Sequence, residues 1–142
     1  NKTQEVFMDR FVKNFILMSI VYLIIATVLG IFMLGNPSLM QFKFIHSHLM
    51  LIGWVSMMIF GVGYHILPKF AGRFLKSKIM GEVQFWLANI GLVGMLGFYT
   101  LGVYNQTDSY RGLTAAFGVI EAVSIFLFFY NMIATLYSKA AE

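Results

Sequence analysis

Residues 44–68 read FIHSHLMLIGWVSMMIFGVGYHILP, a stretch of 25 residues without a charged side chain. A transmembrane α-helix needs roughly 20 such residues to cross a hydrocarbon core of about 30 Å. Three more blocks of the chain are almost free of charge, at residues 14–42, 83–107 and 112–138. The pattern predicts an all-α, polytopic membrane protein: a single four-helix transmembrane domain over residues 1–142, with helices at about 11–34, 44–67, 83–104 and 113–137.

Glycine and proline residues indicate where the helices end and how closely they pack. Gly35, Asn36 and Pro37 mark a turn after the first helix. Pro68 is expected to end the second helix, because proline cannot continue the helical hydrogen bonds. The third helix carries a stripe of small residues, a pattern typical of close helix packing in membranes: Gly91, Gly94, Gly97 and Gly102.

The basic residues divide between the two sides of the predicted bundle. Of the 10 Lys and Arg residues, all but Lys43 and Arg111 lie in the N-terminal segment, the second loop or the C-terminal segment. The positive-inside rule therefore predicts that both termini are cytoplasmic. It follows that His46 and His48 lie near the outer surface and His65 near the inner surface.

The composition excludes several classes of site. The chain has no cysteine, which rules out disulfides, thiolate zinc sites and cysteine-ligated iron–sulfur clusters. The net charge of +4 would suit nucleic acid only on one face of a soluble domain, and here the basic residues lie between apolar spans. We therefore expect a lipid bilayer as surroundings and no nucleic-acid partner. Any cofactor must be held by His, Met, Tyr or carboxylate side chains.

The two histidines near the outer surface, His46 and His48, are two residues apart. On a helix, residues at this spacing point about 200° from one another, so the pair cannot chelate one metal ion. It can instead present one ligand on each of two opposite faces, and imidazole is a common ligand of haem iron. The alternative is two interfacial histidines that bond to carbonyls or lipid headgroups.

The segment around these histidines resembles a known family. Residues 46–72 are similar, without gaps, to the tenth helix of the catalytic subunit of haem–copper oxidases, and most similar to the C-type oxidases and nitric oxide reductases. The matching residues are His46, His48, Gly53, Trp54, Val55, Gly61, Tyr64, His65 and Pro68. By this resemblance the chain is a four-helix stand-alone relative whose other spans correspond to the ninth, eleventh and twelfth helices.

The resemblance implies a cofactor and its ligands. In the family the first histidine of the pair ligates a high-spin haem and the second a low-spin haem, so His46 and His48 are the expected ligands of haem b iron. The family's copper ion takes three further histidines, whereas this chain has only His46, His48 and His65. One copy therefore cannot assemble a haem–copper active site, and no copper is expected.

The second axial ligand of each haem must come from elsewhere. In the family it lies on a helix without a counterpart here, so either a partner chain or a second copy supplies it. If His46 of one subunit and His48 of its neighbour hold one haem, the contacts close into a ring. The family subunit has three pseudo-symmetric arcs of four helices, which favours a homotrimer of this four-helix chain.

Further residues are candidates for supporting roles. Arg111 and Lys43 are expected near the haem propionates, with ordinary headgroup contacts as the alternative. Trp54 is expected to pack near the porphyrin, or simply in the core. His65 is read as a helix-end histidine bonded to carbonyls rather than as a ligand.

Glu121 is the one carboxylate inside a span, roughly 12 Å below the outer end of its predicted helix. An ionised carboxylate there is costly, so we expect it to be protonated, paired or hydrated. One interpretation is a proton relay toward the haem or a quinone site. The other is a neutral side chain bonded across helices, with Ser56 or Asn89 as its partner.

These features favour a homo-oligomeric haem b protein that carries electrons near the outer face of a prokaryotic inner membrane. Quinone or a redox protein is the expected exchange partner, and whether the chain is an oxidoreductase enzyme is left open. A second hypothesis is a five-coordinate haem that binds or reduces nitric oxide or dioxygen. A third is a small non-haem channel or assembly subunit.

Overall fold

The computed structural model describes residues 8–105 and 108–138, and all regular structure within these ranges is helical. Four segments are long and apolar enough to cross a membrane, which confirms the predicted fold class. The first is α1 (Arg10–Gly35), and the last two are α4 (Lys78–Asn105) and α5 (Asp108–Leu136). The second is composite: a 3₁₀ helix η1 (Pro37–Phe42), α2 (Lys43–His48), a π-helix η2 (Leu49–Ser56) and α3 (Met57–Phe70).

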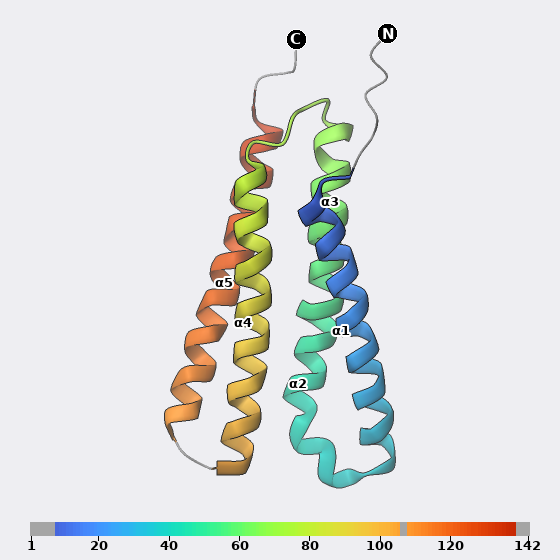
Figure 1. Cartoon of the computed structure of the whole chain (residues 1–142), viewed down its shortest axis with the longest axis vertical. Coiled ribbons are helices and arrows are strands. Elements are labelled where there is room, and N and C mark those ends of the chain that lie inside the picture. The colour runs from blue at the N-terminus through green and yellow to red at the C-terminus, as the bar shows by residue number, and fades with distance from the viewer. Residues whose placement is uncertain (1–7, 106–107, 139–142) are drawn as a thin grey trace.

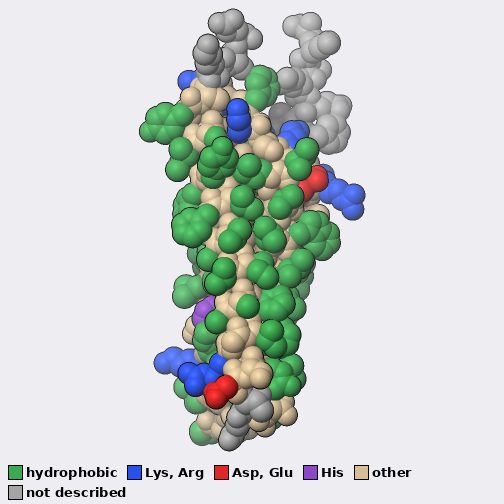
Figure 2. Space-filling view, turned by 90° about the vertical axis from the view of Figure 1, so that its left-hand side faces the viewer, with side chains coloured by type: hydrophobic (Ala, Val, Ile, Leu, Met, Phe, Trp, Pro, Cys, Tyr) green, Lys and Arg blue, Asp and Glu red, His purple; other side chains and the backbone are tan. Residues whose placement is uncertain are grey.

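The spans form two antiparallel hairpins, α1 with the composite span and α4 with α5 (Figure 1). The start of α1 and the end of α5 lie at the same end of the molecule. We call this the basic end, because Lys69, Arg73 and Lys78 lie there, and the opposite end, which carries His46 and His48, the histidine end. Figure 2 shows hydrophobic side chains over the surface between the charged residues of the two ends. Which end faces the cytoplasm stays a prediction.

Aromatic side chains join the two hairpins in the half of the bundle nearer the basic end. Phe15 of α1 packs edge-on against Phe85 of α4, with ring centroids 5.1 Å apart. Phe128 of α5 packs against Phe60 of α3 at 4.7 Å and against Tyr64 at 5.1 Å. Because lipid is as apolar as these side chains, close packing rather than exclusion from water stabilises the contact.

The histidine end is packed less tightly than the basic end. In α1 the last buried residue is Ala26, in α4 it is Leu96, and in α5 the first is Glu121. The outer turns of these three helices therefore hold no buried side chain within the described residues.

The prediction that Pro68 ends the second span was wrong. The helix continues through Pro68 to Phe70, and Gly72 follows with a φ of +59°, a conformation that glycine adopts without strain. The Arg73 N–H donates to the Pro68 carbonyl at 2.8 Å, and the Gly72 N–H donates to the Lys69 carbonyl at 3.1 Å. These two bonds form a Schellman motif, so Gly72 and not the proline ends the helix.

The last two spans begin earlier than predicted. α4 starts at Lys78 instead of about residue 83, because the Ser77 hydroxyl accepts a hydrogen bond from the Met80 N–H at 3.1 Å and caps the first turn. α5 starts at Asp108 instead of about residue 113, with the acidic side chain in its first turn. Both helices thus extend into polar sequence that hydropathy assigned to loops.

Only part of the predicted glycine stripe makes close contacts. A Cβ atom on Gly91 would lie 2.7 Å from the backbone nitrogen of Glu121, and one on Gly94 would overlap the Phe117 ring. Gly97, by contrast, has no atom within 4 Å of that position. The α4–α5 approach therefore depends on Gly91 and Gly94, while the prediction for Gly97 was wrong.

Gly91→Ala should destabilise the bundle by about 1–3 kcal/mol, because the obstructing atoms belong to backbone and cannot rotate away. Gly97→Ala in the same helix is the matched control and should leave stability unchanged. Unfolding of the purified protein in mixed detergent micelles measures both changes. Equal stability of the two variants would contradict the observed helix contact.

Candidate functional site

The His46 side chain faces α1, the helix that forms a hairpin with the span that carries His46. Its Nδ1 atom lies 3.0 Å from the backbone carbonyl oxygen of Ala26. A carbonyl oxygen only accepts hydrogen bonds, so Nδ1 carries the proton and donates it. In the neutral ring the lone pair then sits on Nε2, the atom through which such a histidine binds a metal ion.

Gly30 gives the His46 ring its place beside α1. A Cβ atom at residue 30 would lie 2.9 Å from Cε1 of His46 and 3.4 Å from Nδ1. The Ala26 carbonyl is one helical turn before Gly30, so a side chain on residue 30 would stand over the acceptor. The missing side chain therefore lets the imidazole reach the carbonyl.

His48 is held by its own helix and faces the second hairpin. Its Nδ1 donates to the Phe44 carbonyl at 2.8 Å, which again leaves the lone pair on Nε2. The imidazole also packs on the Phe44 ring, with centroids 3.9 Å apart, and Phe44 stacks on Tyr99 of α4 at 4.3 Å. The Tyr99 hydroxyl donates to the Gln41 carbonyl and ties this stack to η1.

The two imidazoles thus have different neighbours: His46 contacts α1, and His48 contacts Phe44, which in turn stacks on Tyr99 of α4. Both side chains are half-buried, so a ligand or another chain can reach part of each ring. Within residues 8–105 and 108–138, no three His, Asp or Glu side chains gather into a metal site. An iron bound on either face of this helix would take only one histidine ligand from this copy of the chain.

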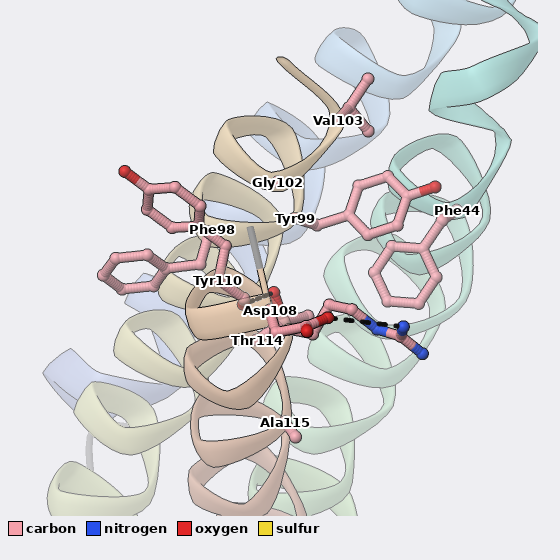
Figure 3. A pocket seen from close by; sticks show the side chains of 10 residues that line it. Phe44, Phe98, Tyr99, Gly102, Val103, Asp108, Tyr110, Thr114 and Ala115 are labelled. Carbon is pink, nitrogen blue, oxygen red and sulfur yellow. Dashed lines mark hydrogen bonds and ion pairs between the residues drawn. The ribbon is translucent and has the colours of Figure 1, made fainter. Parts of the chain in front are cut away.

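A cavity of about 560 Å³ lies beside the His48 stack (Figure 3). Its walls come from α2, α4 and α5, and four of the ten lining residues are aromatic: Phe44, Phe98, Tyr99 and Tyr110. Arg111 and Asp108 also line it, and both side chains are almost fully exposed, with 4.0 Å between the Arg111 Nη1 and Asp108 Oδ1 atoms. An ion pair this exposed contributes little, so the guanidinium can exchange its partner.

Two other predicted residues lie apart from this cavity. Lys43 is exposed at the start of α2. Trp54 is half-buried in the π-helix η2, six residues after His48. Neither is among the residues that line the cavity.

His65 differs from the other two histidines in its hydrogen bond. Its Nε2 atom lies 2.9 Å from Nζ of Lys69, one turn further along α3. An ammonium group only donates, so the Nε2 lone pair is already engaged. The expected carbonyl partner was wrong, but the lysine contact likewise argues against metal binding.

Glu121 is buried against α4 and has a different environment from the one predicted. Ser56 donates to the Leu51 carbonyl, and Asn89 accepts from the Tyr22 hydroxyl at 2.7 Å and donates to the Phe85 carbonyl. Both carboxylate oxygens are buried without a hydrogen-bond partner among the described residues. The predicted bonds to Ser56 or Asn89 are therefore not formed, because both groups bond elsewhere.

The sequence prediction missed Gly30, Phe44 and Tyr99. The spacing of four residues between Phe44 and His48 is a usable signal, since such residues are neighbours on one helix face. Gly30 and Tyr99 give no such signal, because their roles arise only when α1 and α4 are placed beside α2.

Comparison with known proteins gives two significant matches. The family model described as cytochrome c and quinol oxidase polypeptide I matches residues 6–110. A cbb3-type cytochrome c oxidase subunit, CcoN1 of Stutzerimonas stutzeri, is 43% identical over 49 residues, which are 34% of this chain. The chain matches only 10% of the length of that relative. No solved structure gives a significant match.

Proposed function

Because the chain belongs to the cytochrome c and quinol oxidase polypeptide I family, we propose that it binds haem b in the membrane through His46 and His48. In this proposal the chain forms a homo-oligomer, with a trimer favoured, and transfers electrons within a prokaryotic inner membrane.

The observation that supports the proposal is the hydrogen bonding of the two imidazoles. Each Nδ1 donates to a backbone carbonyl, of Ala26 or of Phe44, and so each Nε2 keeps its lone pair. Metal-binding histidines are oriented in this way by a second hydrogen bond. When bound, haem would supply a one-electron carrier whose iron has no open position if both axial sites are filled by imidazole.

The geometry of the pair favours ligands from two chains. His46 contacts α1 and His48 contacts α4 through Phe44, so the two imidazoles cannot converge on one iron. A second copy of the chain can supply the missing ligand if His46 of one subunit faces His48 of the next. Such a contact is heterologous and closes into a ring. The loose packing of the histidine end leaves room for it.

In this proposal three further candidate residues contact the haem. The Arg111 guanidinium at the cavity rim would bind the anionic propionates, for which a bidentate fork is well suited, and Lys43 would assist at the start of α2. Trp54 would pack beside the porphyrin. The only other histidine, His65, is engaged by Lys69, so the proposal includes no copper. Quinone or a redox protein would exchange electrons with the complex.

His46→Ala and His48→Ala should each abolish the low-spin absorption bands of the purified protein, because every site needs one residue of each kind. His65→Ala is the matched control and should keep them. Carbon monoxide should leave the reduced wild-type spectrum unchanged. A carbon monoxide shift would instead support a five-coordinate gas-binding haem, and a colourless protein after expression with ample haem would support a non-haem role.

Co-expression of the two variants tests whether neighbouring subunits share each haem. In a mixed trimer one of the three contacts joins an intact His46 to an intact His48, so the low-spin bands of purified mixed rings should return to about a third of the wild-type intensity. Differently tagged copies allow the mixed rings to be purified. Bands that stay absent from mixed rings would contradict ligation between subunits.

Gly30→Ala should weaken haem binding by about 10–100-fold, the usual effect of losing a hydrogen bond that orients a metal ligand. The added methyl group would displace His46 from the Ala26 carbonyl. Gly35→Ala at the end of the same helix is the control, since nothing lies within 4 Å of its Cβ position. Haem titration measures both affinities, and equal values would exclude this role of Gly30.

A further inference from the structure

Glu121 is a buried acid that the proposed haem site does not use. It lies in the middle of α5, beyond residue 110, where the family match ends. The side chain is 2% exposed, and neither carboxylate oxygen has a hydrogen-bond partner among the described residues. An unpaired ionised carboxylate is costly at this depth, so the group is stable there only with its proton or with water.

The groups around Glu121 provide no compensating charge. From α4, Gly91 lies against it, with an ideal Cβ position 3.0 Å from Oε2 of the glutamate. From α1, the Tyr22 hydroxyl is the nearby titratable group, and it donates to Asn89 of α4. No Lys or Arg side chain in the described ranges forms an ion pair with Glu121.

Further buried polar groups lie between Glu121 and the basic end. Ser124 follows one turn along α5, is 0% exposed, and its hydroxyl has no partner in the described structure. Next along α5 is Phe128, whose ring packs against Tyr64 of α3, and the Tyr64 hydroxyl is also buried without a partner. Gln84 of α4 is 0% exposed, and neither its amide nitrogen nor its amide oxygen has a hydrogen-bond partner in the described structure.

This series of buried polar groups reaches the loop at the basic end through Asn131. Its side-chain amide donates to the Ser77 carbonyl at 2.8 Å and accepts from the Ser77 N–H at 3.2 Å. The buried face of α5 therefore presents polar groups from the middle of the membrane to this loop. Buried polar groups without protein partners are usually satisfied by internal water.

We infer that Glu121 is a proton-binding site that exchanges its proton with the basic end through water held by Ser124, Gln84 and Tyr64. The carboxyl group keeps the proton when it is at rest. The polar side chains supply hydrogen-bond partners for the water, and they need not contact one another. This role is independent of haem and does not rest on the proposed function.

Infrared spectroscopy of the purified full-length chain tests the site directly. The wild type should show the C=O stretch of a protonated carboxylic acid, and Glu121→Gln should lose it. In D₂O the wild-type band should shift as deuterium replaces the proton. A missing band, a band that survives in Glu121→Gln, or a band that never shifts in D₂O would each overturn the proposal.

Substitutions of these buried polar side chains test the proposed path of proton exchange. Ser124→Ala and Gln84→Leu should slow the deuterium shift by about tenfold, which corresponds to about 1.4 kcal/mol in the exchange barrier. Thr100→Val is the matched control, because this hydroxyl bonds to the Leu96 carbonyl nearer the histidine end. Equal rates in all three variants would overturn the route. If a variant fails to fold, the D₂O shift of the wild type still decides whether the site exchanges.

Discussion

A polar group inside a membrane has to find its hydrogen-bond partner within the protein, because hydrocarbon offers none. Most polar side chains of this chain meet that constraint through backbone. The Ala26 and Phe44 carbonyls hold His46 and His48, and Asn131 binds both the N–H and the carbonyl of Ser77. These bonds fix the two imidazoles and anchor the loop between α3 and α4 to α5. The few buried polar groups without a protein partner therefore indicate where internal water is expected.

The same constraint explains what the sequence could predict. Charge is so costly in hydrocarbon that the uncharged blocks alone revealed four spans and the all-α fold class. Helix ends depend on local hydrogen bonds, and there Gly72 outweighed the more conspicuous Pro68. The π-helix after His48 left no sequence signal. Partners across helices, such as the Tyr22 contact of Asn89, required the helices to be placed in space.

Packing within the bundle is uneven in a way that suits assembly. Phe15, Phe60, Phe85 and Phe128 join all four spans toward the basic end, whereas the turns around the histidines bury few side chains. Close packing is the main source of stability between helices in lipid. The side chains at the histidine end make few such contacts within the chain and are available to pack against another molecule. A cofactor or a second copy placed there would add contacts that the isolated chain lacks. The aromatic cluster meanwhile keeps the two hairpins together.

The histidine pair and Glu121 are near enough to influence each other through charge. Thr114 and Tyr99 line the same cavity, which places the His48 stack at the level of residue 114 on α5. Glu121 is seven residues further, or about 10 Å along the axis. The lateral distance between the helices adds to this separation, so at an effective dielectric constant near 20 unit charges at the two sites would interact by at most about 1.5 kcal/mol. A charge gained at the histidine end would therefore change the proton affinity of Glu121 by up to about tenfold. Proton exchange from the basic end and electron transfer at the histidine end would then be coupled without any shared residue.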